Sequence, residues 1–321
     1  LCILFKYNVL NAHVIFNIML FGSHPNTLDL YHLFTNAEFA LEYAKNINLI
    51  YNSIICDKCN HEMFITRINS FQYGQCFYCK CGNRRSILIG SYFMYSKIPI
   101  NKDFHLIYCW ANEFSCSTTI KETKICKNTV TLRFQQLREA CLDYISEMNE
   151  NHLIGGNGKI VEIDETCISH RKYNRGRLVK EVWVFGGICR EDGDVFAITV
   201  PDRTKETLIK ELQKHVLPDT IIYSDCWKAY SDIDQYFKDH KQVNHSTNFV
   251  DPVTKCNTQR IERLWRDLKK IIKKYEGVPT DAINRYVGEY IWRRNEIKNK
   301  GIDPFYAILN LLIQTEFIPQ N

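Results

Sequence analysis

The sequence contains no uninterrupted run of about 18 apolar residues, which is the length that a membrane-spanning helix requires. The apolar stretch at residues 1–23 is broken by five polar side chains, those of Lys6, Asn8, Asn11, His13 and Asn17. It also lacks the layout of a secretory signal peptide. We therefore expect an intracellular protein without membrane contact. The chain begins with Leu1 rather than Met, and residues 1 to about 25 give no clear structural prediction.

A strong net charge is also absent, since 41 Lys and Arg face 36 Asp and Glu and leave a formal charge of +5. The charge is uneven, however. Between Lys255 and Lys300 there are 13 Lys and Arg against 6 Asp and Glu, a larger surplus than that of the whole chain. A basic segment of this kind favours a phosphate-bearing partner. The alternative is an ordinary solvated helix face.

The composition excludes a disordered chain, because 45% of the residues are hydrophobic and 24% are charged. A length of 321 residues suffices for two or three domains. The 14 cysteines do not indicate a disulfide scaffold. They are scattered except for one cluster at residues 56–81, and the chain is long enough to build a core without cross-links. We interpret them as reduced thiols and a metal site.

The cysteine cluster has the spacing of a zinc ribbon. Cys56 and Cys59 form one pair, and a second group begins about sixteen residues later. Two tight turns that supply two thiolates each are what a tetrahedral Zn²⁺ site requires. We predict one structural Zn²⁺ with His61 as a weaker candidate ligand. The predicted ligands are Cys56, Cys59, Cys76 and Cys81, with Cys79 as the alternative in the second group.

Three helices are predicted after the ribbon, over residues 102–114, 117–124 and 128–148. Ser117 or Thr118 is a plausible cap for the second, and Asn128 opens the third. A short helix, a tight turn and a longer helix outline a helix-turn-helix motif, which reads DNA. This signal is weak alone, because many helical trios bind nothing, and it gains weight beside a zinc ribbon. The polar, Gly-rich residues 149–159 are predicted to form a linker.

Beyond the linker, the helical pattern changes to alternating strands. Three strands should form an antiparallel meander, followed by an amphipathic helix and a strand that ends in an acid. A helix, a short strand and a long final helix complete the order. This order of elements is that of a ribonuclease H-like α/β fold. The predicted strands are 159–168, 181–191, 194–200, 220–225 and 241–246, and the helices are 204–216 and 256–275.

In such a fold the first and fourth strands are neighbours, and Asp164 lies in the first while Asp225 ends the fourth. Glu262 lies in the helix after the fifth strand. Three carboxylates at one sheet edge are costly unless cations neutralise them, and oxygen ligands suit Mg²⁺ or Mn²⁺. By alternation, Glu162 shares the face of Asp164 and Glu165 points away. The alternative is an exposed edge strand with solvated acids.

Several segments, in this order and spacing, resemble one known family over roughly residues 40 to 310. The chain resembles the DDE transposases of the Merlin group, which are related to the bacterial IS1016 and ISXO2-like (IS1595) elements. Upstream, "CDKC", "RRSILIGSYF" and the helical trio match the layout of this family. The matching downstream segments are "VEIDET", "RKYNRGRLVKEVWVFGGICR", "VPDRTKETLIKELQKHVLPDTIIYSDCWKAY", "VNHSTNFVDP", "NTQRIERLWRDLKK" and "EYIWRR".

The resemblance implies a metal-dependent DNA transposase that binds terminal inverted repeats, cuts the DNA and joins it to target DNA. Asp164, Asp225 and Glu262 match the catalytic triad, which would hold two Mg²⁺ or Mn²⁺ ions. His245 would lie near the active site, where it contacts a scissile phosphate or forms a hydrogen bond within its loop. The resemblance also implies a homo-oligomer on DNA, and nuclear localisation in a eukaryotic host.

The expected domains are an N-terminal segment at 1–50, the zinc ribbon at 51–95, the helix-turn-helix-like module at 100–150 and the ribonuclease H-like transposase domain at 158–315. Alternative functions are a host-recruited or inactive transposase-derived DNA-binding protein and a nuclease acting on RNA–DNA hybrids. Two basic groups are expected to bind DNA. They are Lys172, Arg175 and Arg177 in the loop between the first two strands, and Lys269, Lys270, Lys273 and Lys274 in the last helix.

Overall fold

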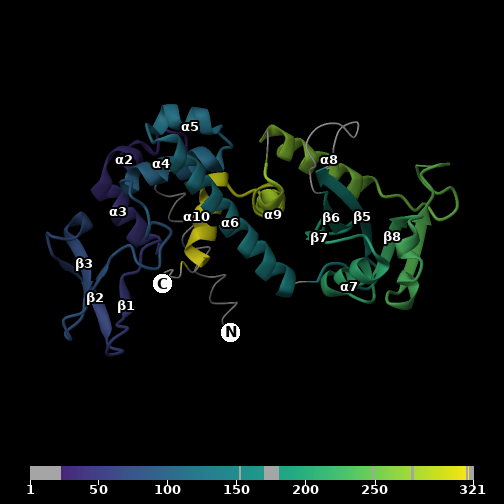
Figure 1. Ribbon diagram of the computed structural model, residues 1–321, viewed down its shortest axis with the longest axis horizontal. Helices are drawn as coiled ribbons and strands as arrows, with labels where there is room; N and C mark the ends of the chain where they lie inside the picture. Colours follow the sequence, from purple (N-terminus) through teal and green to yellow (C-terminus); the bar gives the residue numbers. More distant parts are fainter. Residues whose placement is uncertain are drawn as a thin grey trace. The chain divides into compact units, whose positions relative to one another are not determined.

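The computed structural model describes residues 23–151, 153–169, 181–247, 249–275, 278–315 and 317 (Figure 1). The chain divides into two compact units. Unit 1 comprises the described residues up to Ala140 together with those from Ile302 onward, and unit 2 runs from Cys141 to Gly301. Within the described ranges, no helix has both the length and the apolar character that a membrane crossing needs.

Unit 1 contains a small antiparallel sheet with strand order β1-β2-β3-β4. Its core cluster consists of Cys56, Met63, Phe77 and Cys79, with a few partly buried neighbours. Such a small apolar core rarely stabilises a sheet by itself, and small domains commonly add a metal. The strands are β1 (Ser53–Ile55), β2 (Glu62–Arg67), β3 (Gln75–Tyr78) and β4 (Arg84–Ser86), with a 3-10 turn η1 (Gln72–Gly74) before β3.

The predicted helical trio is present as α4 (Ile100–Ala111), α5 (Cys116–Thr123) and α6 (Lys127–Asn151), and the boundary between the units falls within α6. The predicted cap of α5 is wrong. Ser115 caps the helix, because its extended backbone lets the hydroxyl oxygen accept the Thr118 N–H at 3.0 Å. Two shorter helices, α2 (Tyr31–Thr35) and α3 (Ala37–Asn46), precede the ribbon.

Helix α10 (Pro304–Gln314) belongs to unit 1, although the sequence placed it at the end of the transposase domain. Eight of its eleven residues are buried, so it presents apolar side chains on nearly every side and needs cover all round. It packs against α4, where the rings of Phe305 and Tyr108 meet edge to face at 5.7 Å. The C-terminal segment therefore completes the core of the helical module.

Unit 2 is built on a five-stranded sheet with the order β7-β6-β5-β8-β9. Strands β5, β6 and β7 pair antiparallel, whereas β8 pairs parallel with β5 and β9 pairs parallel with β8. This is the strand order expected for a ribonuclease H-like fold. The strands are β5 (Ile160–Ser169), β6 (Val182–Cys189), β7 (Val195–Val200), β8 (Ile221–Asp225) and β9 (Asp239–Val243).

Two details of the expected order differ. The segment between β8 and β9 forms two 3-10 turns, η3 (Lys228–Tyr230) and η4 (Ile233–Gln235), instead of a full helix. Strand β9 begins at Asp239 and ends at Val243, so the following "NHS" lies beyond the strand and includes a turn. His245 is therefore carried on a turn, where its ring is not committed to either face of the sheet.

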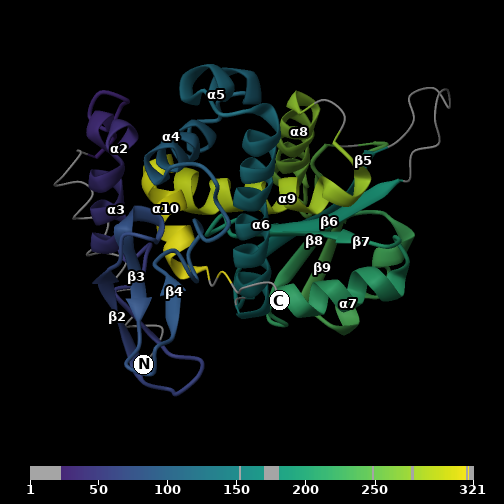
Figure 2. The same ribbon diagram turned by 60° about the vertical axis from the view of Figure 1, so that its left-hand side comes forward.

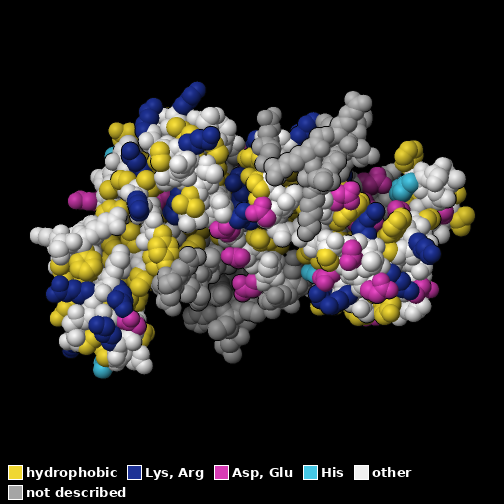
Figure 3. Space-filling view, viewed as in Figure 1, with side chains coloured by type: hydrophobic (Ala, Val, Ile, Leu, Met, Phe, Trp, Pro, Cys, Tyr) yellow, Lys and Arg dark blue, Asp and Glu magenta, His cyan; other side chains and the backbone are white. Residues whose placement is uncertain are grey.

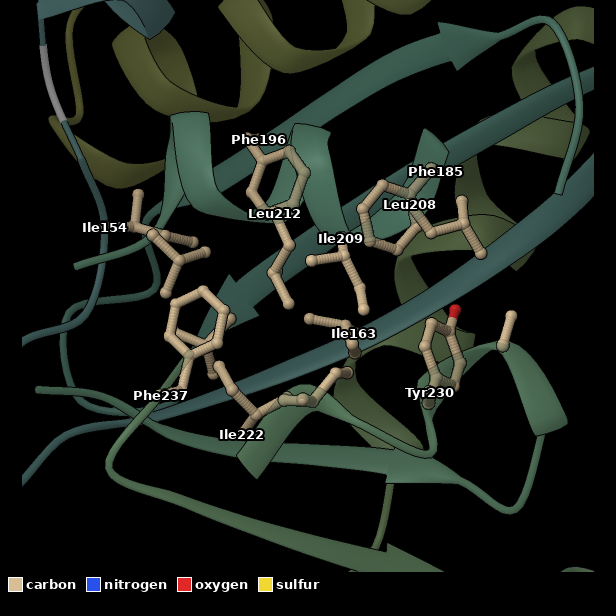
Figure 4. Close-up of a cluster of buried hydrophobic side chains, with 14 of the residues drawn as sticks. Ile154, Ile163, Phe185, Phe196, Leu208, Ile209, Leu212, Ile222, Tyr230 and Phe237 are labelled. Atoms are coloured by element: carbon tan, nitrogen blue, oxygen red, sulfur yellow. The ribbon is translucent and has the colours of Figure 1, made fainter. Parts of the chain in front are cut away.

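Helices cover both faces of this sheet, with α7 on one side and α8 and α9 on the other (Figure 2). On the α7 side, Leu208, Ile209 and Leu212 reach toward Phe185 and Phe196 in one apolar cluster (Figure 4). The helices are α7 (Lys205–His215), α8 (Gln259–Lys274) and α9 (Ile283–Trp292), with a 3-10 turn η5 (Thr280–Ala282) before α9 and a π-helix η6 (Arg293–Asn299) after it.

Helix α8 approaches the sheet at a position that has no side chain. Gly186 of β6 pairs with Asp164 of β5. A Cβ atom on Gly186 would lie 2.5 Å from the carbonyl oxygen of Phe196 and 2.8 Å from the indole of Trp265. The glycine therefore allows Trp265, and with it α8, to pack directly on the strand beside Asp164.

We predict that Gly186→Ala lowers the free energy of unfolding by about 1–3 kcal/mol, because the added methyl group meets backbone on one side and a buried indole on the other. Urea unfolding followed by circular dichroism measures the change. Gly193→Asn is the control, because nothing lies within 4 Å of a Cβ there and asparagine tolerates its positive φ. Equal stability of Gly186→Ala and the wild-type protein would contradict the prediction.

Candidate active site and metal centre

The register between two parallel strands sets the positions of the two aspartates in the acidic site. Ile160 of β5 pairs with Ile221 of β8, and Glu162 pairs with Tyr223. Two residues further along each strand, Asp164 and Asp225 occupy equivalent positions. Because side chains alternate between faces, Asp164 and Asp225 point to the same side of the sheet. Neighbouring strands are about 4.8 Å apart, so this register brings the two carboxylates together.

The electrostatics of Asp164 indicate that Glu262 lies nearby as well. Burial, together with the negative charges of Glu165, Asp225 and Glu262, raises the pKa of Asp164 to about 8. A carboxyl group in this position is protonated at neutral pH unless a cation compensates the charge. The three predicted triad residues are thus close enough to repel one another.

The carboxylates do not form a closed ligand cage. In the part of the chain that the structure describes, the one group of side chains positioned to hold a metal is a set of four cysteines. The carboxylate donors are nevertheless of the kind that Mg²⁺ and Mn²⁺ prefer. The mutual repulsion at Asp164 is what a bound divalent cation would relieve, so the residues fit such an ion.

Glu262 lies in the first turn of α8, with its side chain about half exposed. The hydroxyl of Thr258 donates to Glu262 Oε1 at 3.0 Å, and His245 Nε2 lies 3.2 Å from the same oxygen. His245 Nε2 is also 2.8 Å from Thr258 Oγ1. The imidazole therefore contacts the third carboxylate directly, which the sequence did not predict.

Glu162 holds the helix that carries Glu262. Its side chain is fully buried, and Arg190 Nε donates to Oε1 at 2.7 Å. The backbone N–H groups of Arg260 and Ile261 donate to Oε2 at 2.8 and 3.1 Å. These amides belong to the first turn of α8, where backbone donors lack partners within the helix. A residue of the strand that carries Asp164 thus caps the helix that carries Glu262.

This role of Glu162 was missed by the sequence reasoning, which placed it only on the face of Asp164. The sequence carries no local signal for this role, because the amides that donate to Glu162 lie about a hundred positions further along the chain. The guanidinium of Arg190 adds a second link, because it also donates to the carbonyl oxygen of Asn257 at 2.9 Å.

Glu165 points away from the face of Asp164, as alternation predicts, but it is not free. Its side chain is 7% exposed. It accepts a hydrogen bond from the hydroxyl of Tyr230, and its Oε1 lies 3.5 Å from Arg203. Burial raises the pKa of Glu165. This carboxylate belongs to a second set of contacts on the opposite side of the strand.

The second site is the cysteine cluster of unit 1, in which the four sulfur atoms lie within 4.8 Å of one another. Cys56 Sγ is 3.6 Å from Cys81 Sγ, and Cys59 Sγ is 3.3 Å from Cys79 Sγ. The chemistry and number of these donors fit one tetrahedral Zn²⁺ ion. The cluster consists of Cys56, Cys59, Cys79 and Cys81.

The predicted ligand Cys76 is therefore corrected to Cys79, the alternative in the second group. Cys76 lies inside β3, opposite Thr66 and Ser86 in the ladders to the neighbouring strands. Cys79 opens the turn that follows, in which Gly82 N–H donates to the Cys79 carbonyl oxygen at 2.8 Å. The first pair has the same design, with Asn60 N–H donating to the Cys56 carbonyl oxygen at 2.9 Å. Turns, not strands, present these thiols.

The environment of Cys56 favours the thiolate that a metal requires. The side-chain amide of Asn83 donates to Cys56 Sγ at 3.3 Å, and this hydrogen bond lowers the pKa of Cys56 to about 6. His61 lies outside the cluster, and its Nδ1 is 2.8 Å from the carbonyl oxygen of Cys59.

The structure describes only one of the two predicted basic groups. The lysines of α8 are exposed on the helix beyond Glu262. The loop residues Lys172, Arg175 and Arg177 lie outside the described residues. The exposed lysines are Lys269, Lys270, Lys273 and Lys274.

Comparison with known proteins finds similarity to a transposase domain over most of unit 2. Residues 153–295 match the ISXO2-like transposase domain, a DDE-type domain. An uncharacterized transposase-like protein of Haemophilus influenzae is 29% identical over 124 residues, which cover 39% of this chain and 97% of that protein. The male abnormal protein mab-31 of Caenorhabditis elegans is 22% identical over 165 residues, or 46% of this chain and 38% of that protein.

The strand order is that of a ribonuclease H-like fold, and the matching family is one of DDE-type domains. Residues 153–295 are therefore similar to the ISXO2-like (IS1595) transposase family.

Among solved structures, the HTLV-2 integrase catalytic core domain in complex with magnesium is similar at 18% identity and a TM-score of 0.29, over 46% of this chain and 89% of that one. The catalytic core domain of BIV integrase is similar at 16% identity and a TM-score of 0.31, over 47% of this chain and 93% of that one. These scores are too low to carry weight, and the fold assignment rests on the strand order.

For the cysteine cluster, we predict one Zn²⁺ per chain in protein purified without chelators. Cys79→Ser should lose the metal and destabilise the ribbon, because Zn²⁺ binding contributes directly to the folding of such modules. Cys76→Ser is the matched control and should keep the metal. Elemental analysis by mass spectrometry measures both. Zinc retained by Cys79→Ser and lost from Cys76→Ser would reverse the assignment.

For Glu162, we predict that replacement by Ala lowers the free energy of unfolding by about 3–5 kcal/mol, because it leaves Arg190 and two helix amides without their acceptor. Glu162→Gln retains one carbonyl oxygen and should cost less. Urea unfolding measures both changes, with exposed Glu206→Ala of α7 as the control. If Glu162→Ala were as stable as the control, the cap would not stabilise α8.

Proposed function

We propose that the chain is a Merlin-group DNA transposase that cuts DNA at terminal inverted repeats and joins the 3′ ends to a target site. One observation carries the proposal. Within an ISXO2-like transposase domain, Asp225 and Glu262 lie close enough to the buried Asp164 for their charges to contribute to its raised pKa. A cluster of this kind is typical of a cation site in an enzyme that acts on phosphodiester bonds.

In this proposal Asp164, Asp225 and Glu262 hold two Mg²⁺ or Mn²⁺ ions. Bound there, the pair would supply activation of the attacking hydroxyl and charge neutralisation at the departing 3′ oxygen. Asp164 must give up its proton for this, because its raised pKa keeps it neutral below about pH 8 in the absence of a cation. No covalent link between protein and DNA is required.

The remaining residues of the site position these carboxylates. Glu162 fixes the first turn of α8, and Gly186 lets that helix lie against β6. His245 holds Glu262 Oε1 at 3.2 Å. From that position its imidazole is available to contact a phosphate of the bound DNA when Glu262 turns toward a cation.

DNA binding in this proposal is divided between two regions. Three lysines are exposed around the turn between α5 and α6, namely Lys121 in α5, Lys124 in the turn and Lys127 at the start of α6. Lys and Arg side chains gather over α5 (Figure 3). We assign sequence recognition to this module, together with the zinc ribbon. The lysines of α8 and the basic residues at 172–177 would bind phosphates without sequence preference. The active form would be a homo-oligomer on DNA, in the nucleus of a eukaryotic host.

The test is cleavage of a duplex that contains the element's terminal repeat, in Mg²⁺. Asp164→Asn, Asp225→Asn and Glu262→Gln should each reduce cleavage and joining to background, because each removes one negative charge from the cation site. Repeat binding, measured by fluorescence anisotropy in Ca²⁺, should stay unchanged. Exposed Glu206→Gln is the control and should cut normally.

Full cleavage by Asp164→Asn, or a covalent adduct trapped on a Tyr or Ser, would contradict this mechanism. Specific binding by a wild-type protein that never cuts would favour the alternative, a transposase-derived DNA-binding protein.

A further inference from the structure

A solvent-exposed indole lies next to the acidic site. Trp227 is 40% exposed, although most tryptophans are largely buried. Its backbone N–H donates to Asp225 Oδ1 at 2.9 Å, so the residue is tied to one of the three carboxylates. Residues Lys228–Tyr230 then form the turn η3, which fixes the chain direction directly after the indole. The side chain therefore has a defined place beside the site.

An arginine holds this indole from one side. The Arg203 guanidinium lies 5.0 Å from the centre of the Trp227 ring and 3.7 Å from that of Trp183. It is also 3.5 Å from Glu165 Oε1, and Glu165 is in turn bonded to Tyr230. Arg203 is thus fixed by a buried carboxylate and two rings, while 35% of its side chain remains exposed. Part of the Arg203 side chain is therefore open to solvent beside the indole of Trp227.

We infer that Trp227 and Arg203 form a stacking surface for an unpaired DNA base beside the scissile phosphate. The inference rests on the proposed function. Paired bases inside a duplex present only their edges to a protein, so a flat surface of this kind can be used only by a base that has left the stack. Stacking of one base on an aromatic ring contributes about 1–3 kcal/mol and is tolerant of sequence.

The location supports a base rather than a protein side chain as the ligand. Trp227 is two residues beyond Asp225, so DNA bound with its phosphate at the carboxylates brings its nearest nucleotides within reach. The guanidinium adds a positive charge and a planar face, a combination that binds nucleotides through cation–π and stacking contacts. Glu165 anchors Arg203 from the buried side, and 35% of the Arg203 side chain remains exposed.

The test compares two fluorescent DNA probes of the same sequence in Ca²⁺, one a blunt duplex and the other a duplex with a two-base unpaired 3′ tail. Wild-type protein should bind the tailed probe more tightly. Trp227→Ala should weaken binding of that probe by about fivefold to a hundredfold while leaving the blunt duplex unchanged. Trp227→Phe should retain most of the preference, because it keeps an aromatic face.

Two further measurements separate stacking from other effects. The slope of binding against salt concentration should be the same for Trp227→Ala and the wild type, because no phosphate contact is lost. Tyr236→Ala is the matched control, since Tyr236 in the same unit is 42% exposed, and it should bind both probes normally.

The outcomes distinguish the two levels of the proposal. Equal binding of the tailed probe by wild type, Trp227→Phe and Trp227→Ala would overturn the stacking surface and leave the transposase proposal standing. Failure of the wild-type protein to bind either probe would overturn both. Should Trp227→Ala fail to fold, a folded Trp227→Leu takes its place, and an unchanged tail preference in Trp227→Leu would contradict the inference.

Discussion

The hydrogen bonds of the Glu162 carboxylate connect the two parts of the acidic site. Asp164 and Asp225 come from neighbouring strands, and their spacing follows from the register of β5 and β8. Glu262 comes from a helix, which has no such register to fix it. A buried carboxylate that accepts two amides from the first turn of α8 supplies the missing constraint, and Arg190 neutralises its charge. Gly186 then sets how closely the helix can approach the sheet.

The acids of β5 therefore perform opposite tasks according to their surroundings. Glu162 is fully satisfied by an arginine and by helix amides, so its burial stabilises the fold. Asp164, two residues later on the same face, has other carboxylates as neighbours and acquires a raised pKa. Glu165 on the opposite face is bonded to Tyr230 and faces Arg203. A strand with three acids in four positions is thus compatible with a core, since each acid has its own compensation or its own function.

The element order could be predicted from the sequence because apolar periodicity distinguishes the strands of unit 2 from its helices. The triad residues could be named because their spacing resembles that of a known family. Contacts between residues that are brought together only by folding could not be predicted from the sequence. The choice of Cys79 over Cys76 depends on where β3 ends and its turn begins, which spacing alone does not determine. The capping role of Glu162 joins residues about a hundred positions apart, and no local pattern reveals such a contact.

The central claim is that Asp164, Asp225 and Glu262 together form a divalent cation site. Anomalous diffraction from crystals of the full chain grown with Mn²⁺ tests it most directly, because the signal locates the metal without assumptions about activity. We predict Mn²⁺ peaks within coordination distance of oxygen atoms from all three carboxylates. Ordered crystals in saturating Mn²⁺ with no peak at this position, or with Mn²⁺ bound only elsewhere, would contradict the claim.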